Sequence, residues 1–114
     1  AEGSQIDWGG HANKQTYIIQ EMLDFDKAIG KALDFAEKDG NTLVIVTADH
    51  ETGGFAIMGG SIKDRIVEGA FTTTHHTGVM IPVFAYGPGA EQFGGIYQNT
   101  DIYHKMMQLL DLKK

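Results

Sequence analysis

An uninterrupted apolar run that ends in an acidic residue and a histidine constrains this fold more than any other feature. Residues 42–48, TLVIVTA, do not alternate between polar and apolar, and Asp49 and His50 follow directly. A continuous apolar run predicts a strand that is covered on both faces, as in a parallel sheet between helices. Gly53 and Gly54 follow two residues later and favour a sharp backbone turn away from a crowded site.

A helix is predicted from about residue 17 to residue 39. Its apolar residues recur at the spacing of one helical face, and they are Phe25, Ala28, Ile29, Ala32, Leu33 and Ala36. Asp24 or Asp26 is expected to cap or complement the amino end of its main part. Gly40 is expected to end the helix in the left-handed conformation.

The remaining segments predict shorter elements. Residues 81–86, IPVFAY, read as a second covered strand, and residues 55–58 and 71–74 as short strands beside the surface excursion SIKDRIVEG. Residues 100–111 predict a last helix, capped by Thr100 or Asp101. Residues 1–16 are small, polar and glycine-rich, which predicts a loop.

The order helix, strand, excursion, strand, helix is typical of an α/β domain. Two main strands are fewer than the roughly 4–6 of a typical sheet. We therefore expect sequence outside this chain to complete the sheet, with some contribution from the excursion.

The amino-acid composition limits the kinds of partner and binding site that this chain can have. A chain of 114 residues with 42% hydrophobic content suits a single domain over residues 1–114 with a substantial core. The net charge of -6 argues against a nucleic-acid partner. The chain has no cysteine, which excludes disulfides and thiolate zinc sites. No apolar stretch reaches the roughly 20 residues of a membrane span.

The residues that could bind a metal ion lie in three segments. They are Glu2, Asp7, His11, Asp49, His50, His75 and His76. Carboxylate and imidazole donors without sulfur suit zinc, magnesium or manganese. Asp7 and His11 would share one face of a helix. Gly9 and Gly10 lie between them, so a loop wrapped around a metal is expected instead, with a solvated polar loop as the alternative.

The second and third segments also leave alternatives open. A charged Asp49 after a buried run costs desolvation energy unless it is paired or metal-bound. Alternatively, Asp49 begins a turn and His50 is merely exposed. Either His75 or His76 could coordinate a metal, and their spacing does not choose between them. His104, between Tyr103 and Lys105, is expected to be a surface residue.

Taken together, the segments resemble a known family. EGSQIDWGGH, TLVIVTADHETGGF and HHTG, in that order, resemble the carboxyl-terminal part of an alkaline phosphatase, and AYGPGAEQFGG and NTDIYHKM resemble its last strand and helix. The resemblance implies an incomplete three-layer α/β sandwich, with a mainly parallel sheet flanked by helices. It also implies hydrolysis of phosphate monoesters at two Zn²⁺ ions and one Mg²⁺ ion in the complete enzyme.

The resemblance assigns roles to individual residues. It implies that Asp7, His11 and His76 hold the first zinc, since the family motif is His-Thr-Gly. It implies that Asp49 and His50 hold two of three ligand positions of the second zinc. At most one well-formed Zn²⁺ site is therefore expected in this chain.

By the same resemblance, Glu2 would bind magnesium, and the nucleophile and the phosphate-clamping arginine would lie in a missing amino-terminal half. Arg65, the one arginine, has no matching context, and no serine or threonine here carries the nucleophile motif. The isolated chain is therefore expected to be inactive. Expected partners are a phosphate monoester, the missing half and further copies of the chain, because uncovered apolar faces promote association. The resemblance alone implies a periplasmic or extracellular location.

Two other functions stay open at this point. Another hydrolase of the same superfamily, a phosphodiesterase or a sulfatase, would use comparable metal ligands. A metal-binding module without catalytic activity would do so as well.

Overall fold

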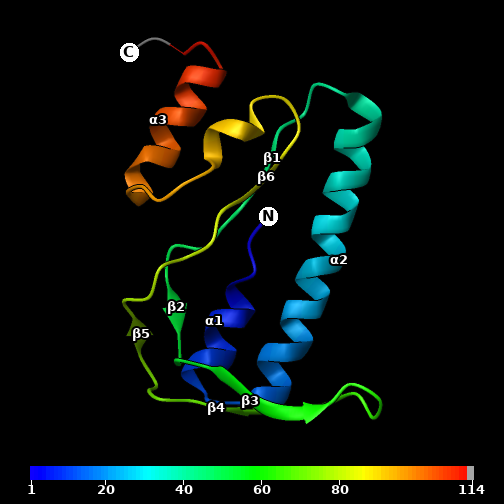
Figure 1. The fold of residues 1–114 in the computed structure, drawn as a ribbon, viewed down its shortest axis with the longest axis vertical. Coiled ribbons are helices and arrows are strands. Elements are labelled where there is room, and N and C mark those ends of the chain that lie inside the picture. Colours follow the sequence, from blue (N-terminus) through cyan, green and yellow to red (C-terminus); the bar gives the residue numbers. More distant parts are fainter. Residues whose placement is uncertain (113–114) are drawn as a thin grey trace. The chain divides into compact units, whose positions relative to one another are not determined.

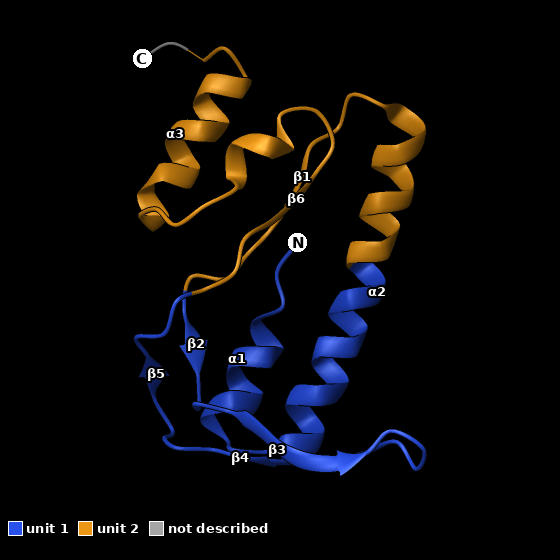
Figure 2. Cartoon of the chain, in the orientation of Figure 1, with its two compact units in different colours: residues 1–28, 50–80 blue, residues 29–49, 81–114 orange. Residues whose placement is uncertain are grey.

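The computed structural model describes residues 1–112, and these form two compact units (Figures 1 and 2). Unit 1 contains residues 1–28 and 50–80, and unit 2 contains residues 29–49 and the chain from residue 81 onward. The boundary between the units falls inside one long helix. The expectation of a single domain over residues 1–114 stays a prediction, and each unit is described by itself.

Unit 1 contains two helical segments and two antiparallel strand pairs (Figure 1). Its elements are α1 (Ser4–His11), the first part of α2 (Gln15–Asp39), β2 (Glu51–Thr52), β3 (Ala56–Ser61), β4 (Ile66–Ala70) and β5 (His76–Thr77). β2 pairs with β5, and β3 pairs with β4. The Gln15 side chain joins α2 to β4, because its amide donates to the Val67 carbonyl at 2.6 Å and accepts from the Gly69 N–H at 2.8 Å.

Unit 2 contains the rest of α2 and one further strand pair. Its other elements are β1 (Val44–Val46), β6 (Phe84–Tyr86), the 3₁₀ helix η1 (Ala90–Phe93) and α3 (Asn99–Leu109). β1 and β6 run antiparallel, with Val44 opposite Tyr86 and Val46 opposite Phe84. No helix within residues 1–112 combines the length and the apolarity that a membrane crossing requires.

The helix ends match the sequence expectations only in part. α2 begins at Gln15, so Asp24 and Asp26 lie inside it and cap nothing. Gly40 follows α2 with φ of 71°, which confirms the left-handed end. The cap of α3 is Gln98 rather than Thr100 or Asp101, and the Asp101 carboxylate accepts from the Gln98 N–H at 3.1 Å in a reciprocal capping box.

The loop predicted for residues 1–16 is wrong, because residues 4–11 form α1. Gly9 and Gly10 disfavour a helix by intrinsic propensity. Both are buried, and a Cβ on Gly10 would lie 2.5 Å from the Thr52 carbonyl oxygen. The glycines therefore let α1 approach β2 closely, and this packing outweighs their weak helix propensity.

The α/β class is confirmed, and the described residues contribute no parallel strand pair to the expected sheet. All three strand pairs there are antiparallel. A continuous apolar run indicates that both faces of a strand can be covered, and it does not indicate the direction of the neighbouring strand. The strands are also shorter than predicted, at residues 44–46 and 84–86.

The excursion SIKDRIVEG forms the turn and the second strand of the hairpin β3–β4, and the strand predicted at 71–74 is wrong. The polar residues that read as a surface loop make the turn itself. The Ser61 hydroxyl donates to the Asp64 carboxylate at 2.7 Å and accepts from the Asp64 N–H at 3.1 Å. This local bonding closes the hairpin.

The substantial core expected from composition is absent from the described residues, where Ala36 and Phe93 are the buried hydrophobic residues. Composition counts apolar residues but does not place them. Large apolar side chains are instead exposed along the hairpin, with Ile57 71%, Met58 73% and Ile62 fully accessible. The expectation of uncovered apolar faces is thereby confirmed.

Candidate metal centre

Unit 1 brings together four of the residues singled out in the sequence. Asp7 and His11 come from α1, His50 precedes β2, and His76 begins β5. Asp7, His50 and His76 each offer one ligand atom, and these three atoms lie within 4.8 Å of one another. Segments that are far apart in the chain, such as those of His11 and His76 with a separation of 65 residues, therefore converge on one small region.

The side chains of Asp7, His11 and His76 form a compact triangle of ligand atoms. The distance between His11 Nε2 and His76 Nε2 is 3.2 Å. Asp7 Oδ1 lies 3.4 Å from His11 Nε2 and 3.5 Å from His76 Nε2. A tetrahedral zinc ion with bonds of about 2.0–2.1 Å holds its ligand atoms about 3.3–3.4 Å apart. The triangle therefore fits three ligands of one such ion.

The helix α1 explains two corners of this triangle. Asp7 and His11 are four residues apart, so they share a helical face. The sequence pattern allowed this arrangement, but the two intervening glycines led to the expectation of a loop. Since both glycines pack against other segments, the helical spacing is retained.

Backbone contacts orient the ring of His11. Its Nδ1 lies 2.7 Å from the carbonyl oxygen of Thr74. A carbonyl oxygen only accepts hydrogen bonds, so Nδ1 carries the proton and Nε2 keeps its lone pair. This is the usual arrangement of a metal-binding histidine, whose second nitrogen donates to a backbone or carboxylate oxygen.

His50 lies against His76, which is one corner of the triangle. Their rings stack with centroids 3.5 Å apart and an interplanar angle of 19°. His50 Nδ1 also lies 3.2 Å from the Thr52 hydroxyl. The structure therefore contains two overlapping groups, both of which include Asp7 and His76.

The strand pair β2–β5 holds His50 and His76 near each other. Glu51 lies opposite Thr77 and Thr52 opposite His76 in this ladder. The Glu51 carboxylate accepts from the Thr77 hydroxyl and from the Gly54 N–H at 2.8 Å. Charge-assisted bonds of this kind are stronger than neutral ones, so Glu51 ties the two strands and the following turn together.

The triangle is open to solvent on part of its surface. The side-chain exposures are 33% for Asp7, 40% for His11 and 49% for His76. A cation held here would therefore remain accessible to an incoming ligand, because the protein side chains do not enclose it.

The other sequence candidates lie outside these groups. Asp49 is exposed and belongs to unit 2, and Glu2 is exposed ahead of α1. Of the two adjacent histidines, His76 is the one that contacts the cluster. His104 is exposed on α3, which confirms that expectation.

Sequence reasoning missed the residues that orient the candidate ligands. Thr52 is a buried polar residue at 7% exposure, and its hydroxyl donates to Asp7 Oδ1 at 2.5 Å. Thr74 and Glu51 act through the contacts described above. The pattern gave no signal for them, because threonine and glutamate are common beside turns and these contacts depend on the tertiary fold.

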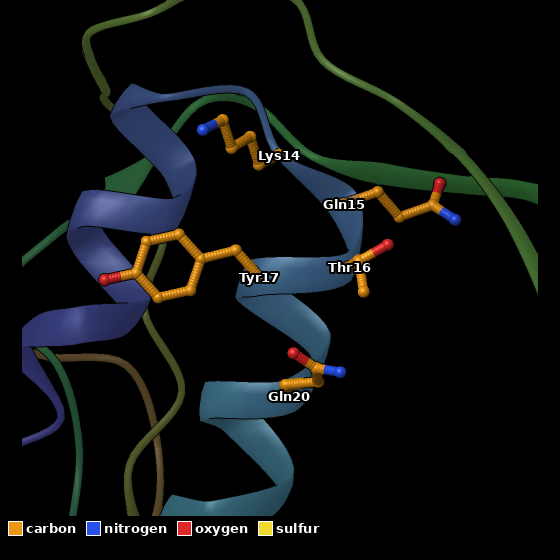
Figure 3. Close-up of a pocket in the computed structure, with 5 residues that line it drawn as sticks. All are labelled: Lys14, Gln15, Thr16, Tyr17 and Gln20. Carbon is orange, nitrogen blue, oxygen red and sulfur yellow. The ribbon is translucent and has the colours of Figure 1, made fainter.

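A hollow in unit 1, separate from the histidine cluster, lies beside the first turn of α2. Figure 3 shows its lining residues, which are Lys14, Gln15, Thr16, Tyr17 and Gln20. None of these five offers a carboxylate or an imidazole, so this hollow lacks the donors of a metal site. Its chemistry differs from that of the histidine cluster.

The sequence of this chain is similar to proteins of one family. The alkaline phosphatase family model matches residues 1–70 and 64–112, and the two matches meet within the hairpin β3–β4. Alkaline phosphatase 4 of Bacillus subtilis strain 168 is 32% identical over 99% of this chain and 39% of its own length. Alkaline phosphatase of Escherichia coli K12 is 34% identical over 98% of this chain and 27% of its own length.

Solved structures give the same result. The alkaline phosphatase from the Antarctic bacterium TAB5 is 54% identical, with a TM-score of 0.91 over 99% of this chain and 35% of that one. A variant of the TAB5 enzyme has been solved with Mg bound in its M3 site. The chain spans between 27% and 39% of the length of the curated relatives named above.

The cluster, the fold and both kinds of similarity therefore agree. The match to the family model extends over nearly the whole chain and includes all three segments that carry Asp7, His11, His50 and His76. The chain belongs to the alkaline phosphatase family.

Proposed function

We propose that this chain supplies much of the metal centre of an alkaline phosphatase that hydrolyses phosphate monoesters. The observation that carries the proposal is the triangle of Asp7 Oδ1, His11 Nε2 and His76 Nε2, whose sides of 3.2–3.5 Å match the ligand spacing of a tetrahedral ion. Family membership supports the reaction class, and the open face of the triangle supports access of a substrate oxygen.

The roles proposed for Asp7, His11 and His76 rest on the geometry of the triangle, and those of Asp49, His50 and Glu2 rest on the family. Asp7, His11 and His76 hold the first zinc ion. Asp49 and His50 hold a second, and His50 stacks against His76 of the first site. In two-metal sites of this kind, the bound ions stabilise the attacking and leaving oxygens of phosphoryl transfer.

The part of these residues in the reaction is to bind and to orient. The rings of His11 and His76 direct their Nε2 atoms toward each other and toward Asp7, and the Asp7 carboxylate adds a negative charge to the site. Glu2 is proposed as a magnesium ligand. We propose no nucleophile among these 114 residues, so the chain by itself should not turn over substrate.

Metal analysis and an activity assay test the proposal together. After zinc loading and dialysis at neutral pH, we expect one tightly retained ion per 114-residue chain. We also expect no appreciable hydrolysis of an aryl phosphate by this chain alone. Absence of bound zinc would remove the metal-centre role, and robust metal-dependent turnover would disprove the lack of a nucleophile.

A chimera tests the reaction class directly. Residues 1–112 would replace the matching segment of Bacillus subtilis alkaline phosphatase 4, with a His76→Ala chimera as the control. We expect zinc-dependent release of phosphate from the first chimera and a loss of that activity in the second. Equal activity in both would argue against His76 as a ligand.

The proposed surroundings of the protein rest on the family and on the exposed apolar side chains. We propose a phosphate monoester as substrate, association with further copies of the chain, and a periplasmic or extracellular location. The exposed hairpin residues Ile57, Met58 and Ile62 support association. Light scattering that shows a monomer at high concentration would count against it.

A further inference from the structure

Thr52 lies where the three segments of the candidate metal centre meet. Its hydroxyl donates to Asp7 Oδ1 at 2.5 Å and lies 3.2 Å from His50 Nδ1. In the β2–β5 ladder Thr52 is also directly opposite His76. One threonine thus adjoins all three members of the group formed by Asp7, His50 and His76.

The single proton of the hydroxyl limits how these groups can bond. A carboxylate only accepts, so the Thr52 hydroxyl must give its proton to Asp7. The hydroxyl oxygen can then only accept from the imidazole, which places a hydrogen on His50 Nδ1. In the neutral ring, the other nitrogen, Nε2, then carries no hydrogen.

From this geometry we infer that Thr52 is a positioning residue of the metal centre, which orients the Asp7 carboxylate and holds His50 as the Nδ1–H tautomer. The inference deepens the proposed function and rests on it for the identity of the bound ion. A histidine can bind a metal only through a nitrogen that carries no proton. In the neutral His50 ring, the contact with Thr52 therefore favours the hydrogen on Nδ1 before any metal is bound.

Burial makes this arrangement rigid. Thr52 is 7% exposed, so water does not readily replace its partners. A Cβ on Gly10 would lie 2.5 Å from the Thr52 carbonyl oxygen, which shows how closely α1 approaches β2 at this point. His11 obtains the same tautomer from the Thr74 carbonyl, so separate contacts prepare both rings for a cation.

The test uses three variants of the chain. Thr52→Val removes the hydroxyl at nearly constant volume, and Thr52→Ser keeps it. Thr16→Val makes the same chemical change at an exposed site on α2, beside the hollow in Figure 3, and serves as the control.

The first readout is the tautomer of His50 in the metal-free protein, measured by long-range ¹H–¹⁵N NMR of the ring. We expect the Nδ1–H form in the unmodified chain, in Thr52→Ser and in Thr16→Val, and a shift toward Nε2–H in Thr52→Val. An Nε2–H ring in the unmodified chain, or an unchanged tautomer in Thr52→Val, would overturn the inference. If Thr52→Val does not fold, the unmodified and serine proteins still decide the outcome.

The second readout is the zinc dissociation constant, measured by competition with a chelating dye. We expect a loss of about 10–100-fold for Thr52→Val, the range typical of residues that orient metal ligands. Thr52→Ser and Thr16→Val should stay close to the unmodified chain. If no form binds zinc, the metal-centre proposal fails, while the NMR result still decides the role of Thr52. Equal zinc affinity in Thr52→Val and the unmodified chain would overturn the positioning role.

Discussion

Unit 1 and unit 2 each contain a short antiparallel ladder, β2–β5 and β1–β6, and the side chains of the two ladders differ in kind. In β2–β5 the paired residues are Glu51 with Thr77 and Thr52 with His76. In β1–β6 the pairs are apolar, and Phe84 and Tyr86 are 64% and 46% exposed. The two ladders are both short and antiparallel, but the paired side chains are polar in β2–β5 and apolar in β1–β6.

The comparison shows how a two-residue ladder can support a binding site. Apolar pairs stabilise a sheet through burial, and β1–β6 buries little in the described residues. In β2–β5 the contacts are directional hydrogen bonds that the Glu51 carboxylate accepts and that the Thr52 hydroxyl makes, so they fix where the neighbouring His50 and His76 lie. We therefore expect changes near this ladder in unit 1 to alter metal binding, and changes in unit 2 away from the proposed ligand Asp49 to alter only stability.

Replacing a ligand in unit 1 should have the largest effect. His76→Ala removes one corner of the triangle, and zinc affinity should fall by more than the roughly 100-fold upper range of orienting residues. His75→Ala is the matched control, because His75 is the exposed neighbour in sequence. Calorimetric titration with Zn²⁺ measures both. Similar losses in the two variants would break the assignment of His76.

A methyl group between α1 and β2 should have the next largest effect. In Gly10→Ala, the helix propensity gain of about 1 kcal/mol is outweighed by overpacking of about 1–3 kcal/mol. The free energy of unfolding should fall, and zinc affinity should fall with it.

The control for this change is Gly30→Ala, at a helical position in α2 where a Cβ meets nothing within 4 Å. This variant should gain up to about 1 kcal/mol without a change in zinc binding. Urea denaturation measures both variants. A stabilised Gly10→Ala protein would contradict the close approach of α1 to β2.

Weaker hydrogen bonds from Thr77 and Gly54 to the Glu51 side chain, at the β2–β5 ladder, should have a smaller effect. Glu51→Gln loses the charge that strengthens the bonds to Thr77 and to the Gly54 N–H. We expect zinc affinity to fall by about 10-fold, at the low end for residues that orient ligands indirectly. Glu68→Gln, on the exposed side of β4, should bind zinc as the unmodified chain does. Equal zinc affinity in Glu51→Gln and Glu68→Gln would show that the hydrogen bonds of Glu51 do not affect metal binding.

The smallest effect is expected in unit 2. The Lys105 ammonium donates to the Gln92 carbonyl at 2.7 Å and lies 4.5 Å from the centre of the Tyr97 ring. Lys105→Met should lower the free energy of unfolding by about 1 kcal/mol. Its zinc affinity should not change. A large loss of zinc binding here would break the functional separation of the two units.

Regular periodicity explains which parts of the fold could be predicted. The apolar face of residues 17–39 predicted α2 to within two residues at its start, and Gly40 gave its end. The last helix was also placed to within two residues. These are local patterns, and local patterns are visible in sequence.

The errors concern contacts between distant segments. The helix α1 depends on the packing of Gly9 against Ile18 and of Gly10 against Thr52. The pairing of Val44 with Tyr86 has no signature in either strand. For the site, the sequence named Asp7, His11, His50 and His76 as candidates, but it could not show that Thr52 joins two of them.

Zinc-edge anomalous diffraction from a zinc-loaded crystal of this chain tests the central claim most directly. Our account predicts one strong peak at about 2.0–2.1 Å from Asp7 Oδ1, His11 Nε2 and His76 Nε2. A peak that is not bonded to these three atoms, or no zinc peak in unit 1, would contradict it.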